Sequence, residues 1–388
     1  MTARRCDACA DADLVPFADL GDVPILCGVH WADRHDAVGS ASGRMHLGHC
    51  PACGYVRNLA FDPALLVYDP TMDTNLHFSA AFAKYSTELV HHLADRYQLT
   101  GRHVLDVGCG QGEFLRELCG HAPCTGTGYD AMYAGPEGPD PSGATLHSAL
   151  APRGASLPRF DFVTSRHWFE HLDDPYEFLV DLRTQAGDRT AHGYLEVPDA
   201  AYDLATAGWE VIYPHVSYFD EYALCRIAQR AGWHVAGSGT YFGGMFRYLE
   251  ITTDPLRRVA DPELPRDAAA HLARIRAFGD RHRAERARWQ EAIATYTAAG
   301  RRPVLWGAGS RAVQFLTSVD MGRELAAVVD VNPRKWGRYL PVSGHRVDPP
   351  ASLAALRPEV VIITNPAYRA EITAALAGLG VEAELEVA

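Results

Sequence analysis

The sequence predicts an α/β protein that contains two parallel, doubly wound sheets and a small additional domain. Over residues 76–250, short apolar stretches typical of buried strands alternate with segments of helical periodicity, and the same alternation restarts after residue 301. Strands that alternate with helices are joined by crossover connections, which favour parallel pairing. Residues 1–60 differ from both regions, because they hold two cysteine pairs and few helical stretches.

Composition and charge indicate a globular protein with several domains. The chain has 388 residues, of which 47% are hydrophobic and 22% are charged. At about 150 residues per domain, this length suggests two or three domains. A net charge of -12 argues against a nucleic-acid partner. No apolar run reaches the ~18 residues that a membrane span needs, and no basic-then-apolar leader opens the chain, so we expect a cytoplasmic protein with no membrane association. The sequence leaves the oligomeric state open and is compatible with a monomer.

The predicted elements are distributed over these regions in order. The Ala/Arg-rich stretch 256–300 has apolar residues at helical spacing, which predicts one long or broken helix that joins two domains. In the region before it, we expect helices at 78–99 and 113–119, and strands at 103–110, 125–130, 160–165 and 193–198. After it, a strand–helix–strand pattern that predicts a smaller parallel-sheet domain occupies residues 302–316, 325–333 and 358–366.

The cysteines of the first 60 residues form two pairs with metal-ligand spacing. Two residues separate Cys6 from Cys9, and two separate Cys50 from Cys53, so each pair can present two thiolates to one ion from a single tight turn. Nine cysteines without a secretory signal argue against a disulfide framework. Four thiolates complete a tetrahedral site and leave no open position for catalysis. We therefore predict a structural Zn²⁺ ion, with buried or redox-active thiols as the alternative.

A glycine-rich loop joins the first predicted strand of the large α/β region to the helix that follows it. Gly108, Gly110 and Gly112 allow a tight turn and a close backbone approach of a ligand at the helix N-terminus. Asp130 ends the next strand, about 20 residues further on, where an acidic side chain can bind the two hydroxyls of a ribose. The loop therefore predicts a nucleoside-containing cofactor, although its GxGxG pattern differs from the GxGxxG of dinucleotide enzymes.

This combination resembles the S-adenosylmethionine-binding motif of class I, Rossmann-fold methyltransferases. Asp106 sits at the strand end, beside the place where the cofactor's ammonium group could lie. The strand at 160–163, followed by residues 166–175, resembles the later Glu-His-Leu motif of the same superfamily. The resemblance implies a methyltransferase core whose cofactor-binding residues are Asp106, Gly108, Cys109, Gly110, Gly112, Asp130, Ala131, Ser165 and His167. A dehydrogenase or epimerase is the alternative interpretation of the loop.

The order of parts along nearly the whole chain resembles a narrower family, the three-domain sugar C-methyltransferases of natural-product biosynthesis. In that family, a four-cysteine zinc domain and a C-terminal Rossmann-like domain flank the methyltransferase core and help enclose a nucleotide-sugar. The resemblance is carried by Leu20-Gly21 with Pro24, and by residues 77–79, 196–198, 307–311 and 329–337. It implies a zinc-binding domain at 1–60, a methyltransferase domain at 61–255, a helical connector at 256–300 and a Rossmann-like domain at 301–388. It also implies that the C-terminal glycine loop contacts substrate rather than NAD.

The sequence departs from this family after the strand at 193–198. The family carries a His-Glu-His segment whose Glu-His pair, with a nearby tyrosine, handles the proton beside a sugar ketone. Read without a gap, Tyr213 replaces the first histidine, Pro214 replaces the glutamate, and His215 is retained. We therefore expect His215 to act as the general base, because imidazole titrates near neutral pH, with a loop-packing role as the alternative. The catalytic candidates are His215, His167, His171 and Tyr213, and the substrate-binding candidates are Tyr85, Tyr218 and Arg166.

The favoured function is transfer of a methyl group from S-adenosylmethionine to a small-molecule acceptor. In-line transfer needs an acceptor that is held close to the methyl group while water is excluded. The resemblance favours a nucleotide-sugar as the acceptor and carbon as the methylated atom, although the family's glutamate is absent. The alternatives are methylation of oxygen or nitrogen in a secondary metabolite, an NAD-dependent nucleotide-sugar dehydrogenase or epimerase, and a non-catalytic S-adenosylmethionine-binding carrier or substrate-binding protein.

Overall fold

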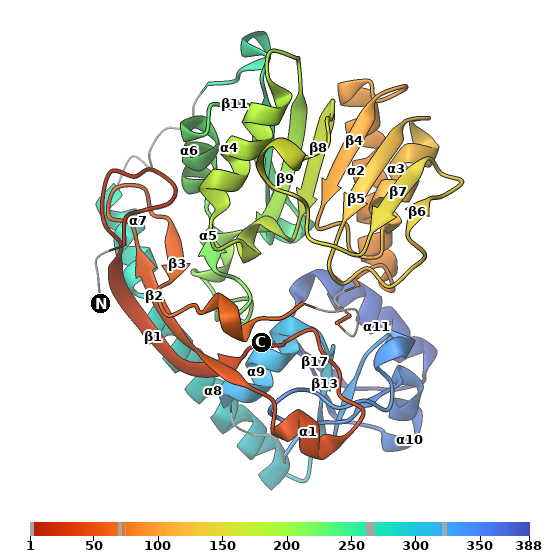
Figure 1. Cartoon of the computed structure of the whole chain (residues 1–388). Helices are drawn as coiled ribbons and strands as arrows, with labels where there is room; N and C mark the ends of the chain where they lie inside the picture. Colours follow the sequence, from red (N-terminus) through yellow and green to blue (C-terminus); the bar gives the residue numbers. More distant parts are fainter. Residues whose placement is uncertain (1–3, 69–71, 74, 261–267, 320–323) are drawn as a thin grey trace.

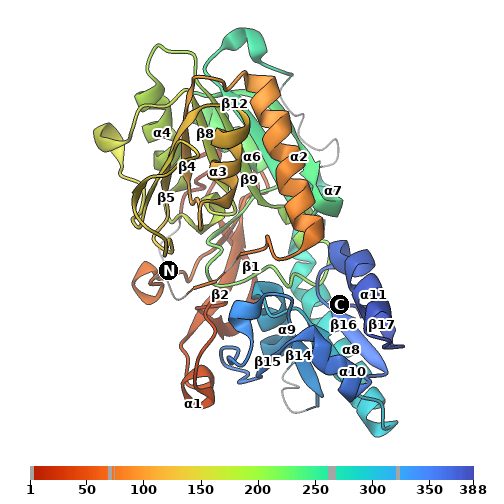
Figure 2. The ribbon, with the colours of Figure 1, turned by 90° about the vertical axis from the view of Figure 1, so that its right-hand side faces the viewer.

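The computed structural model describes residues 4–68, 72–73, 75–260, 268–319 and 324–388, and its strands form three sheets. In Figure 1 the largest sheet occupies the upper part of the molecule, the C-terminal sheet lies below it, and the N-terminal strands run along the left side of both. The side view in Figure 2 keeps the large sheet above and the C-terminal sheet below. Within the described ranges, none of the helices combines the length and the apolar composition that a membrane crossing requires.

The N-terminal sheet is antiparallel, and its last strand comes from a distant part of the chain. A short helix, α1 (Arg34–Val38), lies in the connection between its first two strands. The strands, in spatial order, are β1 (Val15–Pro24), β2 (Ser42–His49), β3 (Val56–Asn58) and β10 (Ser217–Tyr218). Because β10 begins two residues after His215, this sheet fixes one end of the segment that carries the predicted base.

The central sheet has eight strands, five of which are mutually parallel. From β4 the chain proceeds to β5 on one side, whereas β8 pairs with the other side of β4. The strand order therefore reverses at β4, and ligands of open α/β sheets bind beside such a switch point, at the carboxyl ends of the strands. In spatial order the strands are β11 (His234–Tyr241), β12 (Phe246–Thr252), β9 (His192–Pro198), β8 (Phe162–Arg166), β4 (His103–Val107), β5 (Thr125–Tyr129), β7 (Ala144–His147) and β6 (Gly138–Pro139).

Helices cover both faces of this sheet, which gives the doubly wound arrangement that the sequence predicts. Alternate residues of β4 face opposite layers: Val104 packs with α2 and α3, and Leu105 packs with α4 and α6. The four predicted strands and two predicted helices of this region are present, with ends that differ by at most three residues from those expected. The helices are α2 (Ala80–Tyr97), α3 (Glu113–His121), α4 (Pro175–Ala186), α5 (Ala200–Asp203) and α6 (Glu221–Arg230).

The C-terminal domain contains a second doubly wound sheet, in which every pairing is parallel. Leu305 packs beneath α9, whereas its neighbour Val304 packs beneath α11, so this sheet too is covered on both faces. In spatial order its strands are β15 (Val347–Asp348), β14 (Ala327–Val329), β13 (Pro303–Trp306), β16 (Val360–Ile363) and β17 (Glu384–Val387). Its helices are α9 (Ser310–Val319), α10 (Leu353–Leu356) and α11 (Arg369–Gly378).

The stretch predicted as one long or broken helix contains two helices, α7 (Ala268–Arg276) and α8 (Phe278–Ala298). Residues 261–267 of that prediction lie outside the described part of the chain. Trp289 and Ile293 of α8 are buried in the same core as β13 and α9, so α8 forms a layer of the C-terminal domain as well as a connection to it. Single-turn 3₁₀ helices occupy Pro63–Leu65, Gly154–Ser156, Phe169–His171, Phe242–Gly244, Pro255–Arg257, Pro333–Lys335, Pro350–Ser352 and Pro366–Tyr368.

Polar contacts hold the C-terminal domain against the other two parts. At the N-terminus of α2, Glu371 of α11 accepts hydrogen bonds from the Ser79 hydroxyl, at 2.6 Å, and from the Ala81 amide, at 3.1 Å. Trp31 and Tyr339 exchange backbone hydrogen bonds of 2.9 and 2.8 Å. The carboxyl edges of the two parallel sheets consequently face each other, and residues from both edges line one cavity.

Candidate active site

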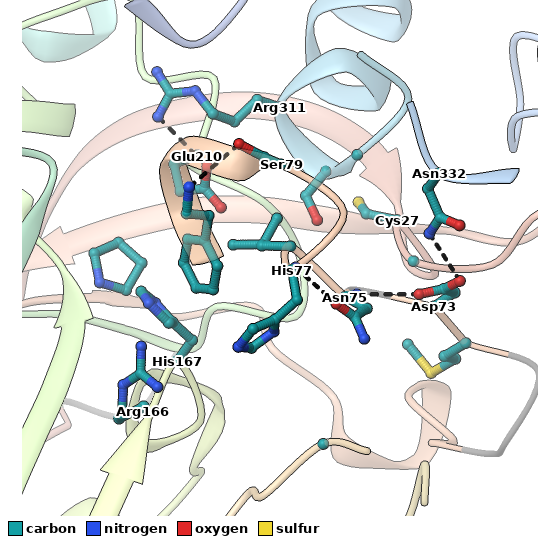
Figure 3. A pocket seen from close by; sticks show the side chains of 18 of the residues that line it. Cys27, Asp73, Asn75, His77, Ser79, Arg166, His167, Glu210, Arg311 and Asn332 are labelled. Atoms are coloured by element: carbon teal, nitrogen blue, oxygen red, sulfur yellow. Dashed lines mark hydrogen bonds and ion pairs between the residues drawn. The ribbon is translucent and has the colours of Figure 1, made fainter. Parts of the chain in front are cut away.

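A cavity of about 390 Å³ lies between the two facing sheet edges. This volume is within the range of roughly 300–1,000 Å³ that small-molecule sites occupy. The loops after β4, β5 and β8 form one wall, the loops after β13, β14 and β16 form the opposite wall, and the segment that leads into α2 contributes His77 and its neighbours. In the close view of Figure 3, Arg166 and His167 come from the methyltransferase-like sheet, and Arg311 comes from the C-terminal domain.

The loop after β4 has a backbone conformation that its glycines permit. Gly108 and Gly110 have φ angles of +77° and +58°, a region that side chains disfavour. A Cβ atom on Gly108 would lie 2.3 Å from Trp168, whereas a Cβ on Gly110 would meet nothing within 4 Å. Because Gly110 also lines the cavity, its backbone is open to a ligand, and a side chain there would occupy ligand space.

Two buried carboxylates stand beside this loop. Asp130 accepts hydrogen bonds from the backbone N–H groups of Gly110, at 2.8 Å, and Met132, at 2.7 Å. Asp106 accepts a hydrogen bond of 2.7 Å from the Thr164 hydroxyl, and burial raises the pKa of Asp106 to about 6. Both carboxylates line the cavity. Their donor sets leave acceptor positions for the hydroxyl and ammonium groups of a ligand, which fits S-adenosylmethionine.

Glu196, at the end of β9, is a fully buried centre of hydrogen bonds. Its carboxylate accepts from the Tyr85 hydroxyl, from the Tyr194 hydroxyl at 2.8 Å and from Nε of Arg166 at 3.2 Å, and it lies 3.1 Å from Nε2 of His167. Burial alone would raise the pKa of Glu196, but Arg166 and His167 lower it to about 2. The carboxylate therefore stays ionised and fixes the two cavity residues Arg166 and His167.

A second cluster brings the two remaining histidines together. Nε2 of His171 and Nε2 of His215 each lie 3.9 Å from a carboxylate oxygen of the buried Glu170. Nδ1 of His215 is 3.1 Å from the backbone carbonyl of Glu210. A carbonyl can only accept, so Nδ1 carries the proton and Nε2 presents a lone pair. Burial, together with His171, holds the pKa of His215 well below its usual range, so this ring does not titrate near neutral pH as the sequence suggests.

Arg311, another charged residue that lines the cavity, links the C-terminal domain to the part of the chain that contains the central sheet. Arg311, in the first turn of α9, donates a hydrogen bond of 2.8 Å to the carbonyl of Thr364. Its guanidinium also lies 3.4 Å from Glu210 and 3.5 Å from Asp203, both in the segment after β9. Burial raises the pKa of Asp203 to about 8 and raises that of Glu210, even with this guanidinium beside them. Figure 3 shows Glu210 and Arg311 pointing toward each other.

The cavity brings together most of the residues that separate sequence motifs predict. Those that line it are Asp106, Gly108, Cys109, Gly110, Asp130, Ala131, Arg166, His167, His171 and His215. Five predicted residues are not among its lining residues: Gly112, Ser165, Tyr85, Tyr213 and Tyr218. Glu170, Glu210 and Arg311 line it although the sequence predicts no role for them. The Glu-His-Leu motif is the only sequence signal for Glu170, and none connects Glu210 with Arg311.

Local packing explains why the five residues lie elsewhere. Tyr213 is buried in the N-terminal core, where its hydroxyl accepts from the backbone N–H of Asp62 at 2.9 Å. The Tyr218 hydroxyl donates to the carbonyl of Ile212 at 3.2 Å. Gly112 is the N-cap of α3, Ser165 is fully buried in β8, and the Tyr85 hydroxyl is bound by Glu196. These contacts direct all five into the protein rather than toward the cavity.

The four cysteines of the N-terminal domain converge as their spacing predicts. Their sulfur atoms lie within 4.8 Å of one another, and all four residues are buried. The Cys6–Cys53 and Cys9–Cys50 sulfur separations are both 3.6 Å. Four thiolates at ~2.3 Å from a tetrahedral zinc ion would be ~3.8 Å apart, whereas a disulfide needs ~2.0 Å. The donor set and its dimensions thus fit a Zn²⁺ ion.

Comparisons with known proteins cover most of the chain in two adjacent segments. Residues 78–236 match the family model of a methyltransferase domain, and residues 243–382 match that of a C-methyltransferase C-terminal domain. A search of curated proteins found no match.

Solved structures of methyltransferases are among the similar folds. Magnesium protoporphyrin IX methyltransferase from Synechocystis PCC 6803, with bound S-adenosylhomocysteine, is 17% identical, and the match covers 47% of this chain and 89% of that one with a TM-score of 0.35. An S-adenosylmethionine-dependent methyltransferase from Aquifex aeolicus is 15% identical, with coverages of 42% and 89% and a TM-score of 0.32. A third, from Mesorhizobium loti, is 16% identical, with coverages of 40% and 92% and a TM-score of 0.33.

The first family match includes the glycine loop after β4, and the second includes the glycine loop after β13. Both loops line the same cavity. The chain is therefore an S-adenosylmethionine-dependent methyltransferase with a Rossmann-like core.

Proposed function

We propose that this enzyme methylates a carbon atom next to the ketone of a nucleotide-sugar or a closely related biosynthetic intermediate. The observation that carries the proposal is the position of His215. His215 lines a cavity that is bounded on one side by the Gly110 loop and on the other by a C-methyltransferase C-terminal domain, and the contact of its Nδ1 with the Glu210 carbonyl leaves the lone pair on Nε2. Methylation of carbon requires removal of a C–H proton, and a neutral imidazole in contact with the acceptor can take that proton.

We assign the cofactor to the wall formed by β4, β5 and β8. Asp130 would bind the ribose hydroxyls, Asp106 would face the ammonium group, and the backbone of Gly108 and Gly110 would allow close approach. S-adenosylmethionine supplies an electrophilic methyl group on a sulfonium centre. Arg166 and His167, fixed by Glu196, would orient the acceptor beside it. Gly307 and Gly309, on the opposite wall, have open space where a Cβ would lie and would receive the distal part of the acceptor.

We assign a structural role to a zinc ion in the N-terminal domain. Cys6, Cys9, Cys50 and Cys53 would use all four tetrahedral positions, so the ion has none left for a substrate. Tyr55, which follows the second cysteine pair, bonds through its hydroxyl to the Ser217 hydroxyl of β10 at 2.6 Å. The metal would thus stabilise the sheet that anchors the segment bearing His215.

The direct test of the function uses methyl-¹³C-labelled S-adenosylmethionine and a panel of nucleoside-diphosphate keto sugars. We expect a product that has gained one labelled methyl group, with an NMR chemical shift typical of methyl on carbon. A label on oxygen or nitrogen would contradict C-methylation. Oxidation or epimerisation of the sugar with NAD, without label transfer, would instead support the dehydrogenase interpretation.

Binding of the cofactor should depend on the Gly110 loop. A valine at position 110 would fill ligand space and adopt an unfavourable φ, so Gly110→Val should abolish S-adenosylhomocysteine binding in isothermal titration calorimetry. Asp130→Ala should weaken binding at least tenfold, because each charge-assisted hydrogen bond contributes about 1.5–3 kcal/mol. The matched control is Gly120→Val, on the exposed end of α3, which should bind normally. Unchanged affinity in both pocket variants would place the cofactor elsewhere.

Metal content should depend on the four cysteines alone. We expect about one zinc ion per chain by elemental analysis, and Cys50→Ser should lose the metal and unfold the N-terminal sheet at a lower temperature, because metal binding and folding are coupled. Cys124→Ser changes another buried cysteine and should retain the zinc. Metal-free wild-type protein, after expression with ample zinc, would refute the assignment.

His215→Asn should lower turnover of the accepted keto sugar by roughly 10²–10⁴-fold, as loss of a general base does, and should leave S-adenosylhomocysteine affinity intact. His35→Asn, in exposed α1, is the control. Because the lowered pKa of His215 keeps the imidazole neutral at neutral pH, kcat/KM should be level from about pH 6 to 8 and should fall only as the pH drops through that lower pKa. Full turnover by the variant would make His215 a packing residue.

A further inference from the structure

Glu170 is a buried acid that borders the cavity, and its carboxyl group forms no hydrogen bond with the described part of the chain. Its side chain is 2% exposed, and neither carboxyl oxygen has a hydrogen-bond partner among the described residues. One of these oxygens lies 3.9 Å from Nε2 of His171 and 3.9 Å from Nε2 of His215. A buried carboxyl group that makes no hydrogen bond destabilises the fold, so its place beside the proposed base calls for a ligand atom.

The distances between Glu170 and the two histidines indicate what kind of ligand atom could lie beside them. Nε2 of His171 and Nε2 of His215 each lie 3.9 Å from a carboxyl oxygen of Glu170. The ligand atoms of the three residues all lie within 4.8 Å of one another. Two ligands at ~2.1 Å from a metal ion would be only ~3.0–3.4 Å apart. Two groups that each bond to one oxygen atom at ~2.8 Å would be ~4.0–4.6 Å apart for angles between 90° and 110°. The separation between Glu170 and His171 is therefore close to that of two groups that bond to one oxygen atom, and the lone pair on Nε2 of His215 lies beside that position.

We propose that Glu170 is a catalytic residue that, as a neutral carboxylic acid, donates a hydrogen bond to the ketone oxygen of the acceptor and stabilises the enolate that forms when His215 removes the adjacent proton. The inference rests on the proposed C-methylation of a ketone. Glu170 does not replace the glutamate base of the sugar C-methyltransferase family. It donates a hydrogen bond to the ketone oxygen, whereas the imidazole of His215 removes the proton from carbon.

The surroundings of Glu170 favour its neutral form. Burial is the main cause that holds its pKa well above the usual range, and the nearby carboxyl groups of Glu210 and Glu196 raise it further. The other titratable groups near it include His171, His215 and Tyr68, whose hydroxyl lies 3.0 Å from Nδ1 of His171 and whose own pKa burial and Glu170 raise. Burial lowers the pKa of both imidazole rings, that of His171 to about 4, so neither offers a cation that would favour a carboxylate. An acid kept neutral in this way can donate a strong hydrogen bond at pH 7.

The step balances without any further reagent. The C–H bond next to the ketone breaks, its proton moves to Nε2 of His215, and its electron pair forms a carbon–carbon double bond. The carbonyl π pair moves to oxygen, where the O–H of Glu170 donates to the developing negative charge. The reverse movement returns the proton, so the step alone would exchange that hydrogen with solvent.

The protonation of Glu170 can be measured on the zinc-loaded protein without any acceptor. In the infrared difference spectrum of wild type minus Glu170→Gln, we expect the C=O band of a protonated carboxylic acid at pH 7. Glu177→Gln, an exposed glutamate of α4, is the control and should show no such band. A band that disappears as the pH rises through about 4–5, as for an ordinary glutamate, would overturn the proposal.

Enolate formation can be measured with S-adenosylhomocysteine bound, so that no methyl transfer occurs. A nucleoside-diphosphate keto sugar in D₂O should lose the NMR signal of the hydrogen next to its ketone. Glu170→Leu should slow this exchange ~10²–10³-fold, as loss of an oxyanion donor does, whereas Glu170→Gln, which keeps an N–H donor, should slow it by no more than about tenfold.

These measurements distinguish failure of the role proposed for Glu170 from failure of the proposed acceptor. Exchange in Glu170→Leu at the wild-type rate would overturn the role of Glu170. Equal loss in Glu170→Gln and Glu170→Leu would also overturn it, because a carboxylate base or a metal ligand would then be required. Absence of exchange in wild type would instead contradict the proposed acceptor, while the infrared band would still report the proton on Glu170.

Discussion

The partly buried guanidinium of Arg311 keeps the two sheet edges that carry the glycine loops face to face. It binds the C-terminal domain through the Thr364 carbonyl, and it lies between Asp203 and Glu210 of the segment that follows β9. Loss of hydration raises the pKa of both acids and favours their neutral forms, and the neighbouring guanidinium is the group that makes an anion tolerable there. The segment from Asp203 to β10 is thus anchored by an ion pair at one end and by strand pairing at the other, and His215 lies between the two anchors.

The facing arrangement also explains how one cavity can serve two ligands. Each parallel sheet contributes its own switch point, with a glycine loop at the carboxyl ends of its strands. The cations that line the cavity are already paired with carboxylates: Arg166 with Glu196, Arg311 with Glu210 and Asp203, and Lys335 with Asp330. The N–H groups of Gly307 and Ala308 already donate to Val329 and Asp330, so negatively charged groups of an acceptor would rely on the backbone N–H groups of Gly309 and Ser310, where α9 begins and favours an anion.

Much of this organisation follows from the sequence, because it depends on local patterns. Strand and helix periodicity, the Gly108–Gly112 loop, Asp130 and the paired cysteines predict the α/β core, the cofactor wall and the four-cysteine cluster. Side-chain direction in irregular segments has no such pattern. Tyr213 and His215 are two residues apart, yet one packs into the N-terminal core and the other borders the cavity. The arrangement of Glu170, Glu210 and Arg311 around one cavity arises from the tertiary packing of three distant segments, which no spacing in the sequence encodes.

The pairing of β10 with β3 has a consequence for attempts to transplant this enzyme. Ser217 and Tyr218 form the last strand of a sheet whose other strands precede them in the sequence by more than 150 residues. A shortened chain that began at the core would lack β3 and Tyr55, which would leave this strand without its neighbour and Ser217 without its hydrogen-bond partner. The core is continuous in sequence but incomplete in space, so chimeric enzymes that exchange acceptor preference should keep the N-terminal domain and the 199–219 segment from the same parent.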